Sequence, residues 1–162
     1  MVEHPEKTIQ EFAEAASRAG LDCGLATITH EAQPAPHLQP SLPANKCAVY
    51  VFSLSASHGQ NCPAGVHRAL KVGKAGPNSR ARFQYQHYNP RSSRSNLAAS
   101  LVGTPILWPY LGVQTLADSL VGRWIRENVD RDNFYLDFAD SGLLMQLERY
   151  IRARLGPVFE GD

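Results

Sequence analysis

The sequence predicts an α+β fold in which a small antiparallel sheet of three strands is flanked by helices. Two short runs rich in β-branched and aromatic residues, Cys47–Leu54 and Val66–Gly73, are separated by a stretch of Ser, Gly, Asn and Pro. This pattern is typical of two strands that form a hairpin. A third run of the same kind, Phe134–Phe138, lies far downstream. Segments with helical periodicity precede, separate and follow these runs, which predicts that helices cover the sheet.

Helices are expected over residues 5–19, 78–88, 92–102, 115–128 and 141–155. Pro5 suits the first turn of the first helix, and Gly20 follows it as a stop signal. The second helix is expected to end before Pro90. Ser141 is the expected cap of the last helix, which Gly156 ends.

The N-terminal quarter of the chain is expected to lie outside the main domain. A length of 162 residues suits one domain with a short appendage. Between residues 31 and 45 four prolines predict an extended linker: Pro34, Pro36, Pro40 and Pro43. We therefore expect residues 1–44 to form a helix and a linker, and residues 45–162 to form the main domain.

Composition points to a globular cytoplasmic protein. Hydrophobic residues make up 43% and charged residues 19% of the chain, as is usual for globular domains. No run approaches the 18 or so apolar residues that span a membrane, and the acidic N-terminus does not resemble a signal peptide. Three widely spaced cysteines imply no disulfide framework: Cys23, Cys47 and Cys62. The sequence does not indicate an oligomeric state.

Charge is distributed very unevenly along the chain. Residues 32–117 contain no aspartate or glutamate but hold eight basic residues, whereas the whole chain has 16 basic and 15 acidic residues. This acid-free stretch therefore has a net charge of +8, and the remainder has −7. A basic region of this kind attracts polyanions, of which phosphate backbones are the commonest. A loop-rich segment can also lack acids by chance, but the length of this interval favours a function.

Positive charge and glycine coincide at the end of the second predicted strand. Lys71 and Lys74 end this strand, and Arg82 lies in the helix that begins a few residues later. Gly73 and Gly76 allow a ligand to approach the backbone closely, and the N-terminus of the helix offers unpaired N–H donors. The junction therefore predicts a phosphate-binding site, although a solvated basic turn would contain the same residues.

In these segments the chain resembles the GIY-YIG nucleases. Ala48-Val49-Tyr50 stands in for the Gly-Ile-Tyr of that family, and Lys71-Val72-Gly73-Lys74 is similar to its Tyr-Ile-Gly-Lys. Arg82 matches the arginine on the following helix. The run Leu147-Glu148-Arg-Tyr-Ile-Arg-Ala-Arg-Leu-Gly-Pro157 resembles the segment with the metal-binding glutamate, and Phe159 takes the aromatic position after it. The resemblance covers roughly residues 46–162.

The resemblance implies hydrolysis of phosphodiester bonds in DNA with one divalent metal ion, Mg²⁺ or Mn²⁺. Glu148 would hold the metal, which would otherwise keep water molecules and bind phosphate oxygens. Arg82 and Lys74 would stabilise the charge that develops on the scissile phosphate. An endonuclease is therefore the expected function, with RNA as a substrate that the sequence does not distinguish from DNA.

The same resemblance suggests how the attacking water would be activated. Tyr50 would take a proton from the water, and positive charge from Lys71 would lower the pKa of the Tyr50 phenol. His87 is an alternative base. Side chains around the second helix are candidates for contacts with nucleic acid: Arg80, Tyr85, Gln86, Arg91 and Arg94.

The chain departs from the family pattern at several positions. Lys71 replaces the second tyrosine, and Glu160 stands where an asparagine is common. The family often has His or Tyr one turn after its arginine, whereas Gln86 lies four residues after Arg82 in this chain and His87 follows it. These departures favour an alternative function, a non-cleaving module that binds nucleic acid with the same fold.

Ordinary structural roles are also open for the main candidates. Tyr50 could be a core tyrosine of the sheet, and Glu148 could be a surface residue paired with Arg152 one turn later. His87 could contact DNA or have a purely structural role. A third class, an unrelated enzyme for a small phosphorylated ligand, would also use the basic junction.

Overall fold

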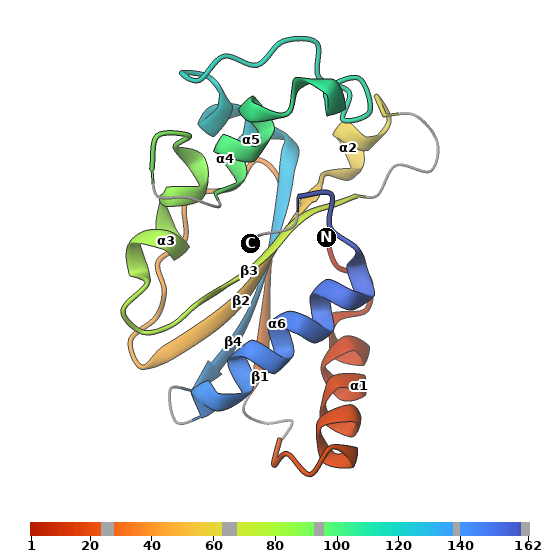
Figure 1. Cartoon of the computed structure of the whole chain (residues 1–162), viewed down its shortest axis with the longest axis vertical. Helices are drawn as coiled ribbons and strands as arrows, with labels where there is room; N and C mark the ends of the chain where they lie inside the picture. The colour runs from red at the N-terminus through yellow and green to blue at the C-terminus, as the bar shows by residue number, and fades with distance from the viewer. Residues whose placement is uncertain (24–27, 63–67, 93–95, 138–139, 160–162) are drawn as a thin grey trace.

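The chain folds as an α+β protein around one antiparallel sheet with helices on both faces (Figure 1). A computed structural model describes residues 1–23, 28–62, 68–92, 96–137 and 140–159. In chain order its elements are α1 (Pro5–Arg18), β1 (Ile28–Gln33), β2 (Lys46–Leu54), α2 (Ala56–Gly59), β3 (Ala69–Ala75), α3 (Arg80–Gln84), the 3₁₀ helix η2 (Gln86–Tyr88), α4 (Leu97–Gly103), the 3₁₀ helix η3 (Pro105–Leu107), α5 (Val121–Asn128), β4 (Val129–Asp137) and α6 (Ser141–Leu155). None of the described helices is long and apolar enough to cross a bilayer.

The sheet has four strands in the order β1-β4-β2-β3, so the prediction of three strands is wrong by one. The additional strand β1 lies at an edge and pairs with β4, from Ile28 opposite Leu136 to Gln33 opposite Arg131. Only Ile28 of β1 is buried. Because most of this strand faces solvent, its sequence lacks the alternation by which strands are recognised.

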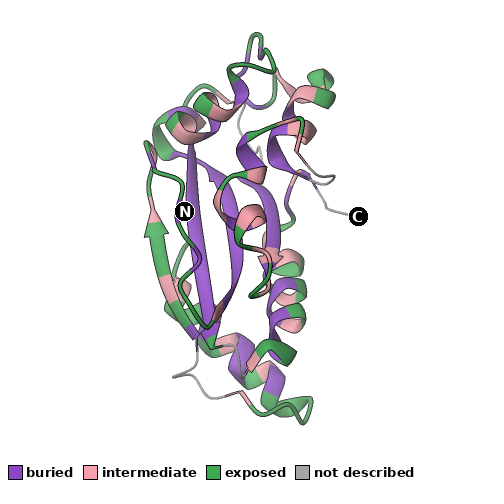
Figure 2. Cartoon of the chain, turned by 90° about the vertical axis from the view of Figure 1, so that its left-hand side faces the viewer, coloured by how far each residue is buried: buried purple, intermediate pink, exposed green. Residues whose placement is uncertain are grey.

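Strand β4 begins five residues earlier than the apolar run at Phe134 predicts. Its first half contains Asp130, Arg131, Asp132 and Asn133, and all four are buried. Polar residues of this kind are depleted in strands, so the sequence does not reveal that they pair with β2. The two middle strands, β2 and β4, are buried along almost their whole length, which Figure 2 shows as purple ribbons between helices.

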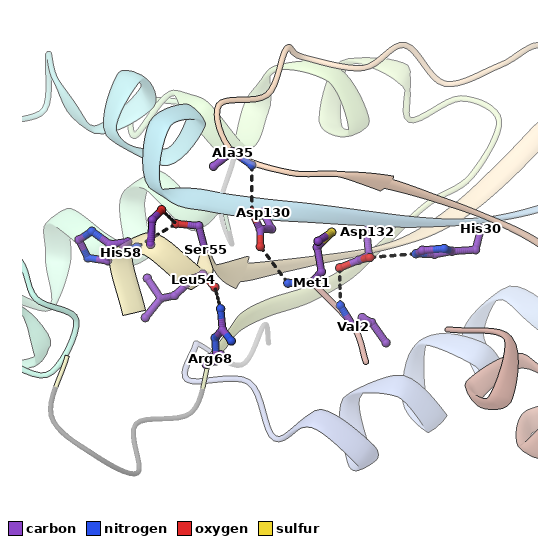
Figure 3. Close-up of polar contacts among 11 residues, drawn as sticks. Met1, Val2, His30, Ala35, Leu54, Ser55, His58, Arg68, Asp130 and Asp132 are labelled. Carbon is purple, nitrogen blue, oxygen red and sulfur yellow. Dashed lines mark hydrogen bonds and ion pairs between the residues drawn. The ribbon is translucent and has the colours of Figure 1, made fainter. Parts of the chain in front are cut away.

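The two buried aspartates of β4 hold the N-terminal segment against the sheet (Figure 3). Asp132 accepts a hydrogen bond from the backbone N–H of Val2 at 2.8 Å, and its other oxygen lies 2.9 Å from Nε2 of His30. Asp130 accepts a hydrogen bond from the backbone N–H of Ala35 at 2.9 Å. Residues 1–44 therefore contribute a strand and buried contacts to the sheet, and the expected boundary at residue 44 does not divide the core.

The helices divide between the two faces of the sheet. On one face α1 and α6 lie side by side (Figure 1), and the rings of Phe12 and Tyr150 are 5.6 Å apart. On the other face α3, η2, α4 and α5 cover Tyr50 and Phe52 of β2. The helix expected over 78–88 is interrupted at Tyr85, where α3 ends and η2 begins. The helix expected from residue 115 begins only at Val121, after a series of turns.

His37 provides a test of the packing of the segment before β2. This side chain is buried, and its Nε2 lies 2.9 Å from the hydroxyl of Tyr88. Burial lowers the pKa of His37 from 6.5 to about 4, and repulsion from Arg131 adds to this effect. Between these two values the unfolded chain binds more protons than the folded chain, so stability falls as the pH falls. We expect His37 to account for a loss of roughly 2–3 kcal/mol between pH 7 and pH 4.5.

The measurement is urea unfolding at both pH values, for the wild type and for His37→Gln. Glutamine cannot titrate, so the variant should lose less stability on acidification. An equal loss in both proteins would show that His37 is not the group responsible.

Candidate active site

A cavity of about 530 Å³ lies at the outer edge of strand β3, between α3 and α6. The end of β3, the start of α3 and one side of α6 line it. Five cationic side chains and one carboxylate face it: Lys71, Lys74, Arg82, Arg149, Arg152 and Glu148. The edge strand thus brings together residues that lie up to 81 positions apart in the sequence. Such an excess of positive charge suits an anionic ligand.

Tyr50 reaches this edge from the neighbouring strand because Gly73 has no side chain. The two residues are paired across β2 and β3. A Cβ atom on Gly73 would lie 2.6 Å from the Tyr50 hydroxyl oxygen and 2.7 Å from two of its ring carbons. The glycine therefore makes room for the phenol to lie across β3. The Tyr50 hydroxyl contacts Arg82, which lines the cavity.

The Tyr50 hydroxyl contacts two nitrogen groups from the elements that follow β3. Arg82 donates a hydrogen bond from Nε at 3.1 Å, and Nε2 of His87 lies 2.7 Å away. The other ring nitrogen of His87, Nδ1, accepts a hydrogen bond from the backbone N–H of Leu97 at 3.2 Å. A neutral imidazole with Nδ1 as an acceptor carries its proton on Nε2, so His87 donates to Tyr50.

Burial keeps His87 in this neutral form. It lowers the pKa of His87 well below its usual value, and the positive charges of Arg131, Arg82 and Lys71 lower it further. Both ring nitrogens are then occupied, and no lone pair is free to take a proton. The expected alternative role of His87 as a base therefore does not fit this arrangement, in which His87 is a donor.

The acidity of Tyr50 also differs from the expectation. Burial raises the pKa of its phenol, while Arg82 and Arg131 oppose the rise. The expected lowering by Lys71 is therefore not found. Lys71 is buried opposite Phe52 on the same strand pair and lies close enough to act on His87.

Glu148 lies on α6 and is only 6% exposed, which excludes the ordinary surface position. Lys74 donates a hydrogen bond to Oε2 of its carboxylate, and Arg152 donates to Oε1 at 3.1 Å. The helical pairing with Arg152 is thus present, but the carboxylate points to β3 and also contacts Lys74. Glu148 is close enough to Tyr50 to act on it electrostatically.

The break between α3 and η2 explains how His87, one residue beyond the expected helical turn after Arg82, reaches the Tyr50 hydroxyl. One turn of a continuous helix after Arg82 leads to Gln86, but α3 ends at Gln84. The tighter turn of η2 then brings His87 to the Tyr50 hydroxyl and leaves Gln86 half-buried beside it.

The side chains expected to contact nucleic acid lie mostly on the surface around α3. Arg80 and Tyr85 are exposed. Arg91 is exposed as well and lies 3.8 Å from a carboxylate oxygen of Asp118. Arg94 and Glu160 lie outside the described residues.

Sequence reasoning missed Arg149 and the role of Arg152 in the cavity. Both follow Glu148 on the exposed side of α6, one residue and one turn later. For Arg152 the signal was present, since residues at i and i+4 share a helix face, but it was interpreted only as a surface ion pair. Arg131 was missed completely, because nothing in the sequence brings it close to Tyr50.

The donor set limits the kind of metal site that these residues could form. The described residues contain no cluster of three or more His, Cys, Asp or Glu side chains that could hold an ion. A cage built only from protein ligands therefore does not fit. One carboxylate, Glu148, fits a hard cation that keeps water molecules and takes phosphate oxygens, provided that Lys74 or Arg152 moves away from it.

Comparisons with protein-family models, with curated proteins and with solved structures found no match. The function is therefore argued from the geometry of the cavity.

We expect Gly73→Ala to disrupt the Tyr50 cluster, which consists of Tyr50 and the surrounding rings of Phe52, Phe83 and His87. The new methyl group would overlap the Tyr50 phenol, and this ring is enclosed by Phe52, Phe83 and His87. Overpacking of this kind costs about 1–3 kcal/mol, and the hydrogen bonds of the hydroxyl would be lost with it. Urea unfolding measures the cost.

Gly103→Ala is the matched control, because nothing lies within 4 Å of the added methyl group. An unchanged stability of Gly73→Ala would mean that the Tyr50 ring does not lie over Gly73.

Proposed function

We propose that the chain is an endonuclease of the GIY-YIG type that hydrolyses phosphodiester bonds in DNA with the help of Mg²⁺ or Mn²⁺. One observation carries this proposal. The Tyr50 hydroxyl, held by Arg82 and His87 over Gly73, lies beside a cationic cavity in which Glu148 is the one carboxylate among the described residues. This combination provides an acid–base group, donors for a phosphate and one hard ligand at the same edge of the sheet.

Arg82 has two successive tasks in this mechanism, one in the free protein and one after the substrate binds. Its Nε holds the Tyr50 hydroxyl, and its two terminal nitrogens are left to donate to the phosphate that is cleaved. Tyr50 is buried, so we infer that Arg82 moves toward the phosphate and opens the hydroxyl to water. Tyr50 then acts as the base after it has released its own proton to solvent, and His87 stabilises the phenolate by donating from Nε2.

Lys74 and Glu148 change partners when the substrate binds. In the free protein they pair with each other. A phosphate in the cavity offers Lys74 a second anion, which frees one oxygen of Glu148 for the metal. A divalent ion bound there would neutralise negative charge on the phosphate and on the leaving oxygen.

Affinity for nucleic acid should fall steeply with salt, because phosphate contacts release counterions. The cavity is cationic, and Arg80 and Arg91 are further basic side chains exposed to solvent, which suits a phosphate backbone. If four to six phosphates are contacted, the slope of log K against log salt should be about −4 to −5. Fluorescence anisotropy with a labelled duplex between 50 and 300 mM salt measures this slope, and a flat response would contradict a polyanion as the ligand.

A nicking assay tests the proposed activity. Supercoiled plasmid is incubated with the protein and Mg²⁺ or Mn²⁺, with EDTA as the control, and relaxed circles are expected only with the metal. Tyr50→Phe, which removes only the hydroxyl, should not nick. Single-stranded RNA and duplex DNA are compared to identify the preferred polymer.

The second candidate is a nucleic-acid-binding module that does not cleave. The ion pairs of Glu148 with Lys74 and Arg152 favour it, because both carboxylate oxygens are engaged in the free protein. Steep salt dependence without nicking in either metal would support this module. Competition by a mononucleotide as strong as that by polymeric DNA would instead indicate an enzyme for a small phosphorylated ligand.

A further inference from the structure

Arg131 is a fully buried arginine behind the Tyr50 cluster. It lies on β4 opposite Phe52 of β2, and it is the largest of the fully buried side chains. Its Nε donates to Oδ1 of Asn133 at 2.9 Å, and its Nη1 donates to the hydroxyl of Tyr88 at 3.2 Å. Its Nη2 has no hydrogen-bond partner in the part of the chain that the structure describes.

Aromatic rings take the place of a carboxylate around this guanidinium. Its central carbon lies 4.3 Å from the ring centre of Phe83, 5.1 Å from that of Phe52 and 5.3 Å from that of Tyr50. Within the described ranges no acidic side chain forms an ion pair with Arg131. The neighbouring aspartates of β4, Asp130 and Asp132, bind the N-terminal segment instead.

Packing alone does not require a charge at this position. Burying an ion costs several kcal/mol, and cation–π contacts return only about 0.5–2 kcal/mol each. An apolar side chain of similar volume would pack there at lower cost. What only a cation supplies is a positive potential in a region of low dielectric constant, where charges act strongly on their neighbours.

The charged and titratable groups around Tyr50 come from five elements, and the signs of the charges differ. Those that face the cluster are Arg82 of α3, His87 of η2, Lys71 of β3, Arg131 of β4 and Glu148 of α6. Arg82 is half-exposed and faces the cavity, so a phosphate would draw its charge away. Arg131 cannot move in this way, because it is enclosed in the core.

We propose that Arg131 is a positioning residue for the Tyr50 hydroxyl: its buried guanidinium, without a carboxylate partner among the described residues, favours the phenolate of Tyr50 and the neutral, donating form of His87. This inference rests on the proposed function for its catalytic meaning. The electrostatic effect of Arg131 on Tyr50 and His87 does not depend on that function. The positive charge of Arg131 acts to lower the pKa of both groups, which is the direction that the proposal requires.

The test compares Arg131→Met, which keeps the volume without the charge, with Arg131→Lys, which keeps the charge. The titration of His87 is followed by ¹⁵N NMR and that of Tyr50 by ¹³C NMR of labelled tyrosine, with His87→Gln and Tyr50→Phe for assignment. In Arg131→Met we expect the titration midpoints of His87 and Tyr50 to rise by about one pH unit or more. In Arg131→Lys both midpoints should lie close to their wild-type values. Arg123→Met, which removes an exposed cation of α5, should leave both unchanged.

Equal midpoints in wild type and Arg131→Met would overturn the inference. An imidazolium signal from His87 in the wild type at neutral pH would overturn it as well. If Arg131→Met does not fold, Arg131→Gln, which keeps hydrogen-bonding groups without the charge, takes its place with the same expected rise and the same contradicting result. None of these titrations needs nucleic acid. Shifted midpoints without nicking would therefore refute the proposed function alone, whereas nicking with a pH–rate profile that is the same in Arg131→Met would refute the role of Arg131 alone.

Discussion

We expect Glu148→Gln to abolish cleavage of DNA while affinity for DNA stays the same or rises. Glu148 is the only carboxylate among the described residues that line the cavity, so the variant loses the one protein ligand suited to a hard cation. It also loses a negative charge that repels phosphate. The neighbouring Lys74 and Arg152 side chains are 42% and 30% exposed, so solvent can stabilise their charges and the protein should remain folded.

Plasmid nicking and fluorescence anisotropy on the same preparation measure the two properties separately. Glu127→Gln is the matched control. Glu127 also pairs with an arginine one turn away, but it is exposed and lies on α5, which does not line the cavity. Nicking by Glu148→Gln at the wild-type rate would remove Glu148 from the site. A large loss of affinity would instead indicate that the carboxylate organises the cavity.

Some residues of the candidate site could be predicted from the sequence because neighbouring residues identify the strand or helix on which they lie. Lys71, Gly73 and Lys74 fall within four residues at the end of one strand, and Glu148 lies in a helix with clear start and stop signals. Each could therefore be assigned to an element from its immediate neighbours. The hairpin of β2 and β3 was predicted as well, from short-range pattern, but the pairing of Tyr50 with Gly73 within it was not.

The parts that could not be predicted depend on contacts between distant segments. The polar first half of β4 is buried where the N-terminal segment, the side chain of His30 and the backbone of Ala35 bring hydrogen-bonding partners to Asp130 and Asp132. The identity of the residue that meets Tyr50 depends on a break of the helix at Tyr85, which shifts the contact from Gln86 to His87. Neither effect has a signal in spacing or composition, since both arise from tertiary packing that overrides local preference.

The Arg82→Ala substitution should lower the cleavage rate far more than it weakens binding. At least four other cations of the cavity share the attraction for phosphate, so the loss of one costs little affinity. Among the described residues, Arg82 alone both contacts the Tyr50 hydroxyl and faces the cavity. Loss of a donor placed at developing charge typically reduces a rate by about 10²–10³-fold, and the Tyr50 hydroxyl loses one of its two positioning contacts as well.

Arg80→Ala supplies the comparison, because Arg80 begins α3 two residues earlier and its exposed side chain does not line the cavity. Single-turnover cleavage at saturating protein separates the chemical step from binding. We expect the Arg80 variant to remain close to the wild-type rate with a slightly smaller salt dependence, as for the loss of one phosphate contact. Equal losses in the two variants would mean that Arg82 acts only through its charge, and the contact of its Nε with Tyr50 would then have no part in the reaction.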